Sequence, residues 1–125
     1  MQLLNDLFDI IDKEETDGGL TYRVSFNPAH LIYKVHFPGN PITPGVCLIQ
    51  MTEELLSHHL NRPLYLSCLS NVKFLSTLTP VADAVVSFSF GKLSVTEQEC
   101  RAQLTIGDAG QTYAKLSMQY SYDTL

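Results

Sequence analysis

The sequence of 125 residues is poor in basic residues and in cysteine, and each shortage excludes a class of protein. Only 8 Lys and Arg stand against 13 Asp and Glu, which gives a formal net charge of −5. A nucleic-acid-binding protein would need the opposite balance and a basic stripe. The three cysteines (Cys47, Cys68 and Cys100) are an odd number and lie far apart in the chain, so we expect neither a disulfide framework nor a zinc site. Their apolar or small neighbours predict buried, reduced thiols, as in a cytoplasmic protein.

The chain also lacks a hydrophobic run long enough to cross a membrane. Residues 37–52 contain no Asp, Glu, Lys or Arg, but prolines and a glycine interrupt them, so we expect no membrane span. Residues 1–12 carry acids where a signal peptide carries bases, and export is therefore not predicted. A hydrophobic fraction of 45% over this length is typical of one globular domain, residues 1–125, that can stabilise its own core.

Alternation of apolar and polar residues predicts strands over much of the chain. Residues 20–26 alternate after a turn at residues 17–19, and residues 64–74 also have a strand-like composition. The same period of two recurs in residues 86–90, 100–106 and 114–120, with a hairpin turn at residues 107–110. Residues 3–11, by contrast, place leucines and other apolar residues at helical spacing, which indicates a short amphipathic helix.

Residues 27–44 hold four of the six prolines and yet many apolar side chains, which indicates an irregular, buried loop of the kind that carries function. Thr43 is the expected N-cap of the following helix, with Pro44 as its first residue and Leu60 near its end. Residues 46–51 are apolar all round, which predicts burial on every side. His58 and His59 suit the dipole of the last turn better than a metal site. One long helix followed by antiparallel strands predicts an α+β fold, with a sheet packed around or against a central helix.

No glycine-rich phosphate loop, metal-ligand spacing or Gly-x-Ser-x-Gly motif is present, and we expect no cofactor. The candidate for chemistry is His36, in the proline-rich loop just before the helix. A histidine in an apolar setting is often structural. Gly45, however, lies at the helix start, where a backbone N–H has no intrahelical partner and is free to bind an oxyanion. A histidine beside such a donor is equipped to remove a proton next to a carbonyl group.

The loop and its flanks resemble a known family. Residues 36–46 read His-Phe-Pro-Gly-Asn-Pro-Ile-Thr-Pro-Gly-Val, which resembles the signature of the hot-dog-fold 3-hydroxyacyl-acyl carrier protein dehydratases. The layout around them also fits, and the likeness spans about residues 8–120. The other matching positions are Asn27, Pro28, Ala29 and His30 before the loop, and Val72, Lys73, Phe74, Pro80 and Asp83 after the helix. The resemblance implies a hot-dog fold, in which a curved antiparallel sheet wraps around a long central helix. It also makes residues 8–15 a first strand, so we expect only a short helical turn before it.

The resemblance assigns roles to three residues. His36 matches the histidine that takes the C2 proton of a 3-hydroxyacyl thioester, and Gly45 matches the glycine whose N–H polarises the thioester carbonyl. Gln50 stands where the family has a Glu or Asp that protonates the departing hydroxyl. An amide cannot give up a proton at neutral pH, and general acid catalysis is typically worth about 10²–10⁴-fold in rate. Glu53 or Glu54, one turn further along the same helix face, either replaces this acid or is an ordinary surface carboxylate.

By resemblance, Phe37, Pro44 and Val46 contact the substrate, while Tyr33 lines the acyl tunnel or, as we favour, fills the core. Lys73 is expected at the rim of the site, as a solvated charge or as part of a docking surface for an acidic carrier protein. The substrate would be a thioester of acyl carrier protein or coenzyme A. A homodimer, or a multiple of one, would share each site, with His36 from one chain and Gln50 from the other.

The sequence thus predicts a dehydratase-like protein of fatty acid or related lipid synthesis. Two alternatives remain open at this point. One is a thioesterase of the same fold, which would need an activated water or a carboxylate nucleophile. The other is a catalytically silent subunit that binds acyl carrier protein or dimerises with an active paralogue.

Overall fold

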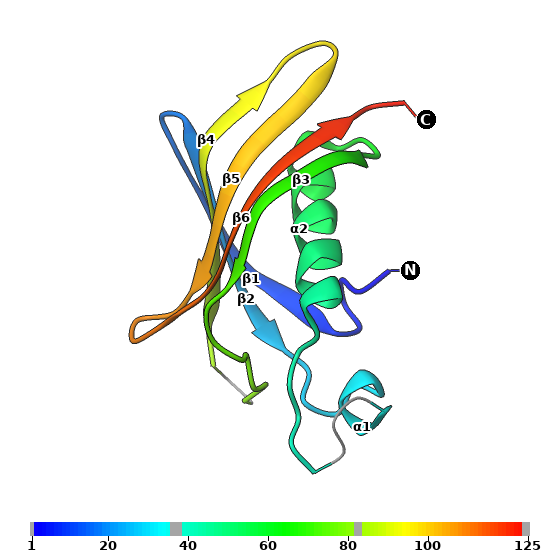
Figure 1. Cartoon of the computed structure of the whole chain (residues 1–125), viewed down its shortest axis with the longest axis vertical. Coiled ribbons are helices and arrows are strands. Elements are labelled where there is room, and N and C mark those ends of the chain that lie inside the picture. The colour runs from blue at the N-terminus through cyan, green and yellow to red at the C-terminus, as the bar shows by residue number, and fades with distance from the viewer. Residues whose placement is uncertain (1, 36–38, 82–83, 124–125) are drawn as a thin grey trace.

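A computed structural model describes residues 2–35, 39–81 and 84–123 (Figure 1). Six strands and two helices follow one another in the order ββααββββ. They are β1 (Phe8–Thr16), β2 (Gly19–Phe26), α1 (Ile32–Val35), α2 (Gly45–Leu60), β3 (Tyr65–Phe74), β4 (Val86–Val95), β5 (Glu99–Gly107) and β6 (Thr112–Ser121). No helix among these residues is both long and apolar enough to span a membrane.

The strands form one antiparallel sheet in the order β1-β2-β4-β5-β6-β3, and its inner face curves around α2 (Figure 1). The core lies between the sheet and the helix. In β2 every second residue is buried, from Leu20 to Phe26, and in β5 the buried residues run from Cys100 to Ile106. Alternation puts these side chains on one face of a strand and the polar ones on the other. The predicted α+β hot-dog fold is confirmed.

The helical pattern of residues 3–11 is misleading, and the strand implied by the resemblance is correct. Phe8 pairs with Phe26 at the start of the β1–β2 ladder, and the register shifts between Ile10 and Asp12. Leu3, Leu7 and Phe8 are buried, whereas Ile11 is 49% exposed. A turn that leads into a strand with a bulge therefore imitates a helical period, because the bulge breaks the alternation of two.

Three further expectations need correction. A short helix, α1, interrupts the loop that we predicted to be irregular throughout. Cys47 and Cys100 are buried and burial raises the pKa of both thiols, but Cys68 is exposed. Cys68 lies on the edge strand β3, where the register shifts just before it. Val46 is 68% exposed, so the first half of α2 is not buried on every side. The sheet covers one side of α2 and leaves a stripe through Val46, Gln50 and Glu53 accessible or only half-buried.

Candidate active site

The start of α2 presents a backbone donor at the end of the proline-rich loop. Pro44 is the N-cap in an extended conformation (φ −61°, ψ 144°), and Gly45 is the first helical residue. The expected N-cap Thr43 is wrong by one position, because its hydroxyl bonds the Tyr33 hydroxyl at 2.8 Å instead of a helical N–H. As the first residue of the helix, Gly45 has an N–H without an intrahelical acceptor. Such a group carries the partial positive charge of the helix N-terminus and can bind a carbonyl oxygen that gains negative charge.

Phe74, at the end of β3, closes over this helix start. A Cβ added to Gly45 would lie 2.7 Å from the Phe74 Cζ atom, which is nearer than atoms can pack. An alanine at position 45 would therefore have to displace the Phe74 ring, so glycine suits this position because of its neighbour and not because of its own backbone angles. The Phe74 side chain is still 51% exposed, so one side of its ring faces outward from the site. In the sequence, Phe74 is recognisable only as part of a matching motif, and its position beside Gly45 could not be predicted.

Gly45→Ala should leave stability nearly unchanged and lower activity by about tenfold. The exposed Phe74 ring can swing aside at a cost of about 1 kcal/mol, which the better helix propensity of alanine offsets by a similar amount. The added methyl and the displaced ring would then crowd the carbonyl oxygen. Gly91→Ala is the matched control, because a Cβ at Gly91 meets no atom within 4 Å. Melting temperatures and turnover on a 3-hydroxyacyl thioester test this, and equal turnover in the two variants would contradict it.

The Tyr33 side chain joins the two ends of the segment 33–43 from inside the core. Its side chain is buried, and its hydroxyl forms the bond to Thr43, ten residues further on. Burial raises the pKa of Tyr33 to about 12, so the hydroxyl stays protonated at neutral pH. The Thr43 N–H also donates to the Leu78 carbonyl at 2.8 Å. These bonds hold the two segments together, and the Tyr33 side chain is part of the buried core.

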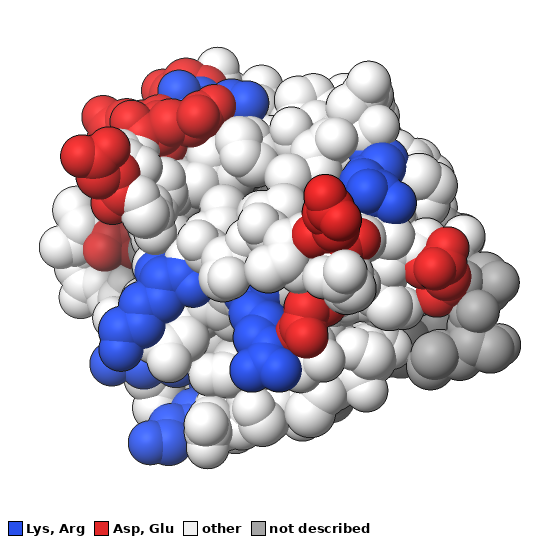
Figure 2. All heavy atoms as spheres, turned by 90° about the horizontal axis from the view of Figure 1, so that it is seen from above, with Lys and Arg blue, Asp and Glu red and all other residues white. Residues whose placement is uncertain are grey.

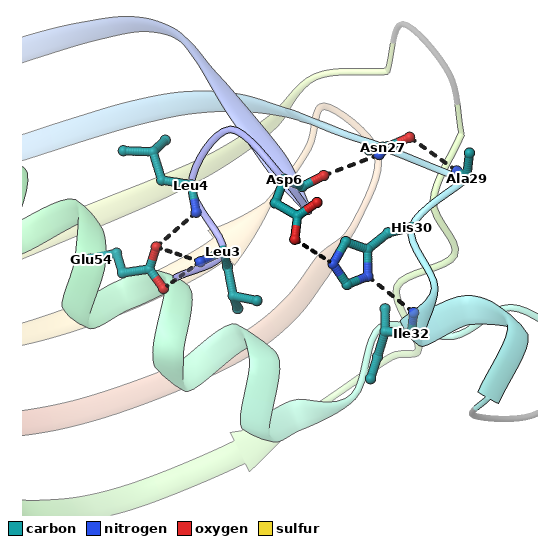
Figure 3. A network of polar contacts seen from close by, with 8 residues as sticks. All are labelled: Leu3, Leu4, Asp6, Asn27, Ala29, His30, Ile32 and Glu54. Atoms are coloured by element: carbon teal, nitrogen blue, oxygen red, sulfur yellow. Dashed lines mark hydrogen bonds and ion pairs between the residues drawn. The ribbon is translucent and has the colours of Figure 1, made fainter. Parts of the chain in front are cut away.

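A second set of bonds fixes the other side of the loop, where the motif residues Asn27 and His30 prove to be structural (Figure 3). The His30 Nδ1 atom accepts the Ile32 N–H at 3.0 Å at the start of α1. A neutral ring that accepts at Nδ1 carries its proton on Nε2, and Nε2 lies 3.2 Å from an Asp6 carboxylate oxygen. His30 thus links α1 to the N-terminal segment with both ring nitrogens. His36 and Phe37, the central residues of the predicted site, lie outside the described residues.

Gln50 takes part in a polar clamp on the N-terminal segment. Its Nε2 donates to the Glu54 carboxylate at 2.9 Å. The same carboxylate accepts the Leu3 N–H at 2.9 Å and the Leu4 N–H at 2.7 Å (Figure 3). Glu54 is the acceptor in all these bonds, so its carboxylate is engaged by the N-terminal segment and by Gln50. A glutamate at position 50 would place a second carboxyl beside this one, so glutamine also has a structural reason to be here.

A hollow of about 540 Å³ opens beside Gln50. Glu53 lines it, and partial burial together with the neighbouring Glu54 raises the pKa of Glu53. Below the helix, Tyr120 of β6 is fully buried, and its hydroxyl has no hydrogen-bond partner among the described residues. Burial and the charge of Glu53 raise the pKa of Tyr120. Glu53 is therefore the carboxyl of α2 whose surroundings favour its protonated form, a feature that the sequence alone did not distinguish from Glu54.

Across residues 2–35, 39–81 and 84–123, no three His, Cys, Asp or Glu side chains converge on a point where a metal ion would fit. One family model, that of ApeI-like proteins, described as ApeI dehydratase, matches residues 12–115. The chain belongs to the ApeI-like dehydratase family. The match includes the loop, Gly45, Gln50 and Phe74, and it confirms the suspected relation to hot-dog dehydratases.

No curated protein matches this member of the ApeI-like family significantly in sequence. Solved structures do match its fold. The dehydratase heterocomplex ApeI:P from Xenorhabdus doucetiae has a TM-score of 0.70 at 18% identity and covers 90% of this chain and 96% of that chain. The PaaI protein from the E. coli phenylacetic acid degradation operon has a TM-score of 0.61 at 14% identity, over 94% and 80% of the chains. A hypothetical thioesterase with coenzyme A from Streptococcus pneumoniae has a TM-score of 0.62 at 11% identity, over 94% and 90%. At such identities the likeness shows the hot-dog fold, which dehydratases and thioesterases share.

Proposed function

We propose that this ApeI-like protein dehydrates 3-hydroxyacyl thioesters carried by acyl carrier protein, in fatty acid or related lipid synthesis. The observation that carries the proposal is the helix start, where Gly45 is the first helical residue and lies against the Phe74 ring. Coenzyme A thioesters share the reacting group and serve as alternative substrates. The exposed Val46 and the N-cap Pro44 lie beside Gly45 and would contact the acyl chain together with Phe37.

In the proposed reaction the Gly45 N–H binds the thioester oxygen, which gains negative charge as the C2–H bond weakens. His36 takes the C2 proton as general base. The electron pair of that bond forms the C2–C3 double bond, and the C3–O bond breaks. The hydroxyl leaves as water once it has gained a proton. Gln50 can donate a hydrogen bond to this hydroxyl but not a proton, so the proton would return from His36 or come from Glu53.

A silent or supporting subunit is the second candidate, and the bond between Gln50 and Glu54 favours it. In such a subunit, position 50 would serve the fold while a second, complete hot-dog chain supplies the acid. The heterocomplex named for the related structure from Xenorhabdus doucetiae gives a precedent for assembly between two different chains.

Turnover of the purified protein on 3-hydroxyacyl and 2-enoyl thioesters, followed in both directions, tests the proposal. Interconversion of the two supports dehydration. Release of free thiol without interconversion would identify a thioesterase instead. A protein that is inactive alone but raises the rate of a co-purified hot-dog chain would be the supporting subunit.

We further propose that two chains assemble, and we expect the protein to purify at twice 14.0 kDa or a multiple of it. β3 is an edge strand, so one side of its backbone has no neighbouring strand among the residues that the structure describes. Val46, Phe74 and Leu75 are exposed apolar residues at the adjoining helix start, and a partner would cover them. Size-exclusion chromatography with light scattering measures the mass. A stable monomer at micromolar concentration would contradict both the assembly and a site shared between chains.

A further inference from the structure

The outer face of the sheet, which points away from α2, is divided by charge. One row of paired residues crosses all six strands and begins with two lysines, continues through three hydroxyl residues and ends with a glutamate. Its members are Lys73, Lys115, Thr105, Ser89, Thr21 and Glu14. Figure 2 shows the same division, with basic side chains gathered at the lower left and acidic ones at the upper left. The β3 half of the face is basic in a protein whose net charge is −5.

Two joined hollows make up this basic half. One of about 400 Å³ is lined by Lys92 and Arg101, and the other, of about 300 Å³, by Lys73 and Lys115. They share Asn71, Gln103 and Ser117, and no acidic residue lines either of them within the described chain. Four of the eight basic residues therefore converge on one region. Arg101 pairs with Glu99, but Lys73, Lys92 and Lys115 form no ion pair with any residue that the structure describes.

The fold keeps this arrangement although it is locally unfavourable. Lys73 and Lys115 are directly opposite each other on β3 and β6, and like charges in such pairs destabilise a sheet. Asn71 (φ 50°) and Lys92 (φ 50°) both adopt the left-handed conformation where the registers of β3 and β4 shift. Non-glycine residues rarely adopt it, and bulges re-aim side chains. Both strained residues line the same hollow. The free-energy costs of the lysine pair and of the two left-handed residues therefore fall on one surface, as expected for a surface that binds a partner.

The spread of the charges favours a protein over a small anion. Lys73 on β3 and Lys92 on β4 are separated by three strand steps, about 14 Å, whereas a single phosphate needs converging donors. Carboxylates three turns apart on a helix are about 16 Å apart, which suits this spacing. Lys73 also lies next to Phe74, the last residue of β3 and the ring over Gly45. A path around the end of β3 therefore leads from the basic surface to the proposed carbonyl site.

We propose that the basic half of the outer face, with Lys73, Lys115 and Lys92 at its centre, docks an acidic helical surface of the acyl carrier protein. The inference rests on the proposed function for the identity of this partner. Complementary charge would orient the carrier on a protein that is otherwise acidic and would repel it elsewhere. The carrier's prosthetic arm would then pass the end of β3 and reach Gly45 between the two chains of the proposed assembly.

The test is a titration of the full chain with a purified holo acyl carrier protein at 50 and 300 mM salt. Lys73→Gln and Lys115→Gln should each weaken binding about threefold at low salt, and the double variant about tenfold, with smaller differences at high salt. Lys13→Gln is the control of equal charge change, because Lys13 lies on β1 on the inner side of the sheet, where its Nζ atom is 3.2 Å from the His59 Nδ1 atom of α2, and its affinity should equal that of the parent. Melting temperatures should not fall in the Lys73 and Lys115 variants, since each relieves a like-charge pair.

Three results would overturn the docking surface: no binding by the parent, parental affinity in the double variant, or an equal loss in Lys13→Gln. Failure of the proposed function is distinguishable from these. Turnover on a small-thiol thioester such as that of N-acetylcysteamine needs no carrier, and the double variant should match the parent there. If the parent turns over neither thioester, the dehydratase proposal fails, whereas the expected losses of carrier affinity would still support the surface.

Discussion

His36→Ala is expected to abolish dehydration while the protein keeps its fold. Loss of a general base typically costs about 10²–10⁴-fold in rate, and the assignment rests on the match of residues 36–46 to the family's motif. Other side chains hold the ends of the loop in place. Tyr33 and Thr43 join its ends in the core, and His30 fixes the segment before it. We therefore expect the free energy of unfolding to change by no more than about 1 kcal/mol.

His30→Ala is the informative comparison, because it removes a second histidine close to the same loop. His30 links Ile32 to Asp6, so its loss should lower the melting temperature, with turnover falling only as far as the loop is displaced. His36→Ala should therefore mainly lower the rate, whereas His30→Ala should mainly lower the stability. Turnover on a 3-hydroxyacyl thioester and thermal unfolding by circular dichroism measure both. If His36→Ala kept most of the rate or failed to fold, His36 would be a structural residue.

The fold was largely predictable, because its main signals are local. Alternation located the strands to within a residue or two at most ends, for example β5 at Glu99–Gly107 against the expected residues 100–106. The proline before Gly45 marked the start of the helix to within one residue. The pattern of apolar residues in the N-terminal segment was misleading, because the bulge after Ile10 breaks the period of two. Family resemblance corrected that error, since it depends on the order of residues and not on a period.

The polar clamp and the basic surface were not predictable, because both depend on pairings between distant residues. Glu54 binds Leu3 and Leu4 about fifty positions away, and nothing in the residues around Glu54 indicates this. Lys73 and Lys115 lie opposite each other only because the edge strand β3 pairs with β6 in this register. Phe74 could have been suspected, since it belongs to the matching motif. Its role as the lid over Gly45 needed the tertiary structure.

Gln50→Glu should raise the rate of dehydration by a sizeable part of the roughly 10²–10⁴-fold that general acid catalysis supplies. The side chains are nearly equal in size, so the helix should accept the change. The new carboxyl would lie beside Glu54, which now accepts a bond from the Gln50 Nε2 at 2.9 Å. A carboxylate at that distance raises the pKa of its neighbour. The new group would thus hold its proton near neutral pH in a hydrogen bond to Glu54. It could then transfer this proton to the departing hydroxyl, which leaves as water.

The same contact predicts a dependence of stability on pH. In the folded state the new carboxyl would bind its proton more tightly than in the unfolded chain, so the unfolded state holds fewer protons and stability falls as pH rises. The melting temperature of Gln50→Glu relative to the parent should therefore drop between about pH 4 and pH 7. Adding Glu54→Gln to this variant removes the like charge. The extra drop should disappear, and part of the gain in rate should disappear with it.

Glu53→Gln in the parent distinguishes the remaining hypotheses. If Glu53, whose pKa is already raised by burial and by Glu54, supplies the proton, this variant should lose most of its activity and Gln50→Glu should add little. If His36 works without an acid, Glu53→Gln should be nearly neutral and Gln50→Glu should give the full gain. A supporting subunit would show no turnover in any of these variants. Initial rates of the parent and both variants on one 3-hydroxyacyl thioester decide between the three. A parent that matches a family member with an acid at this position would show that Gln50 costs the enzyme nothing.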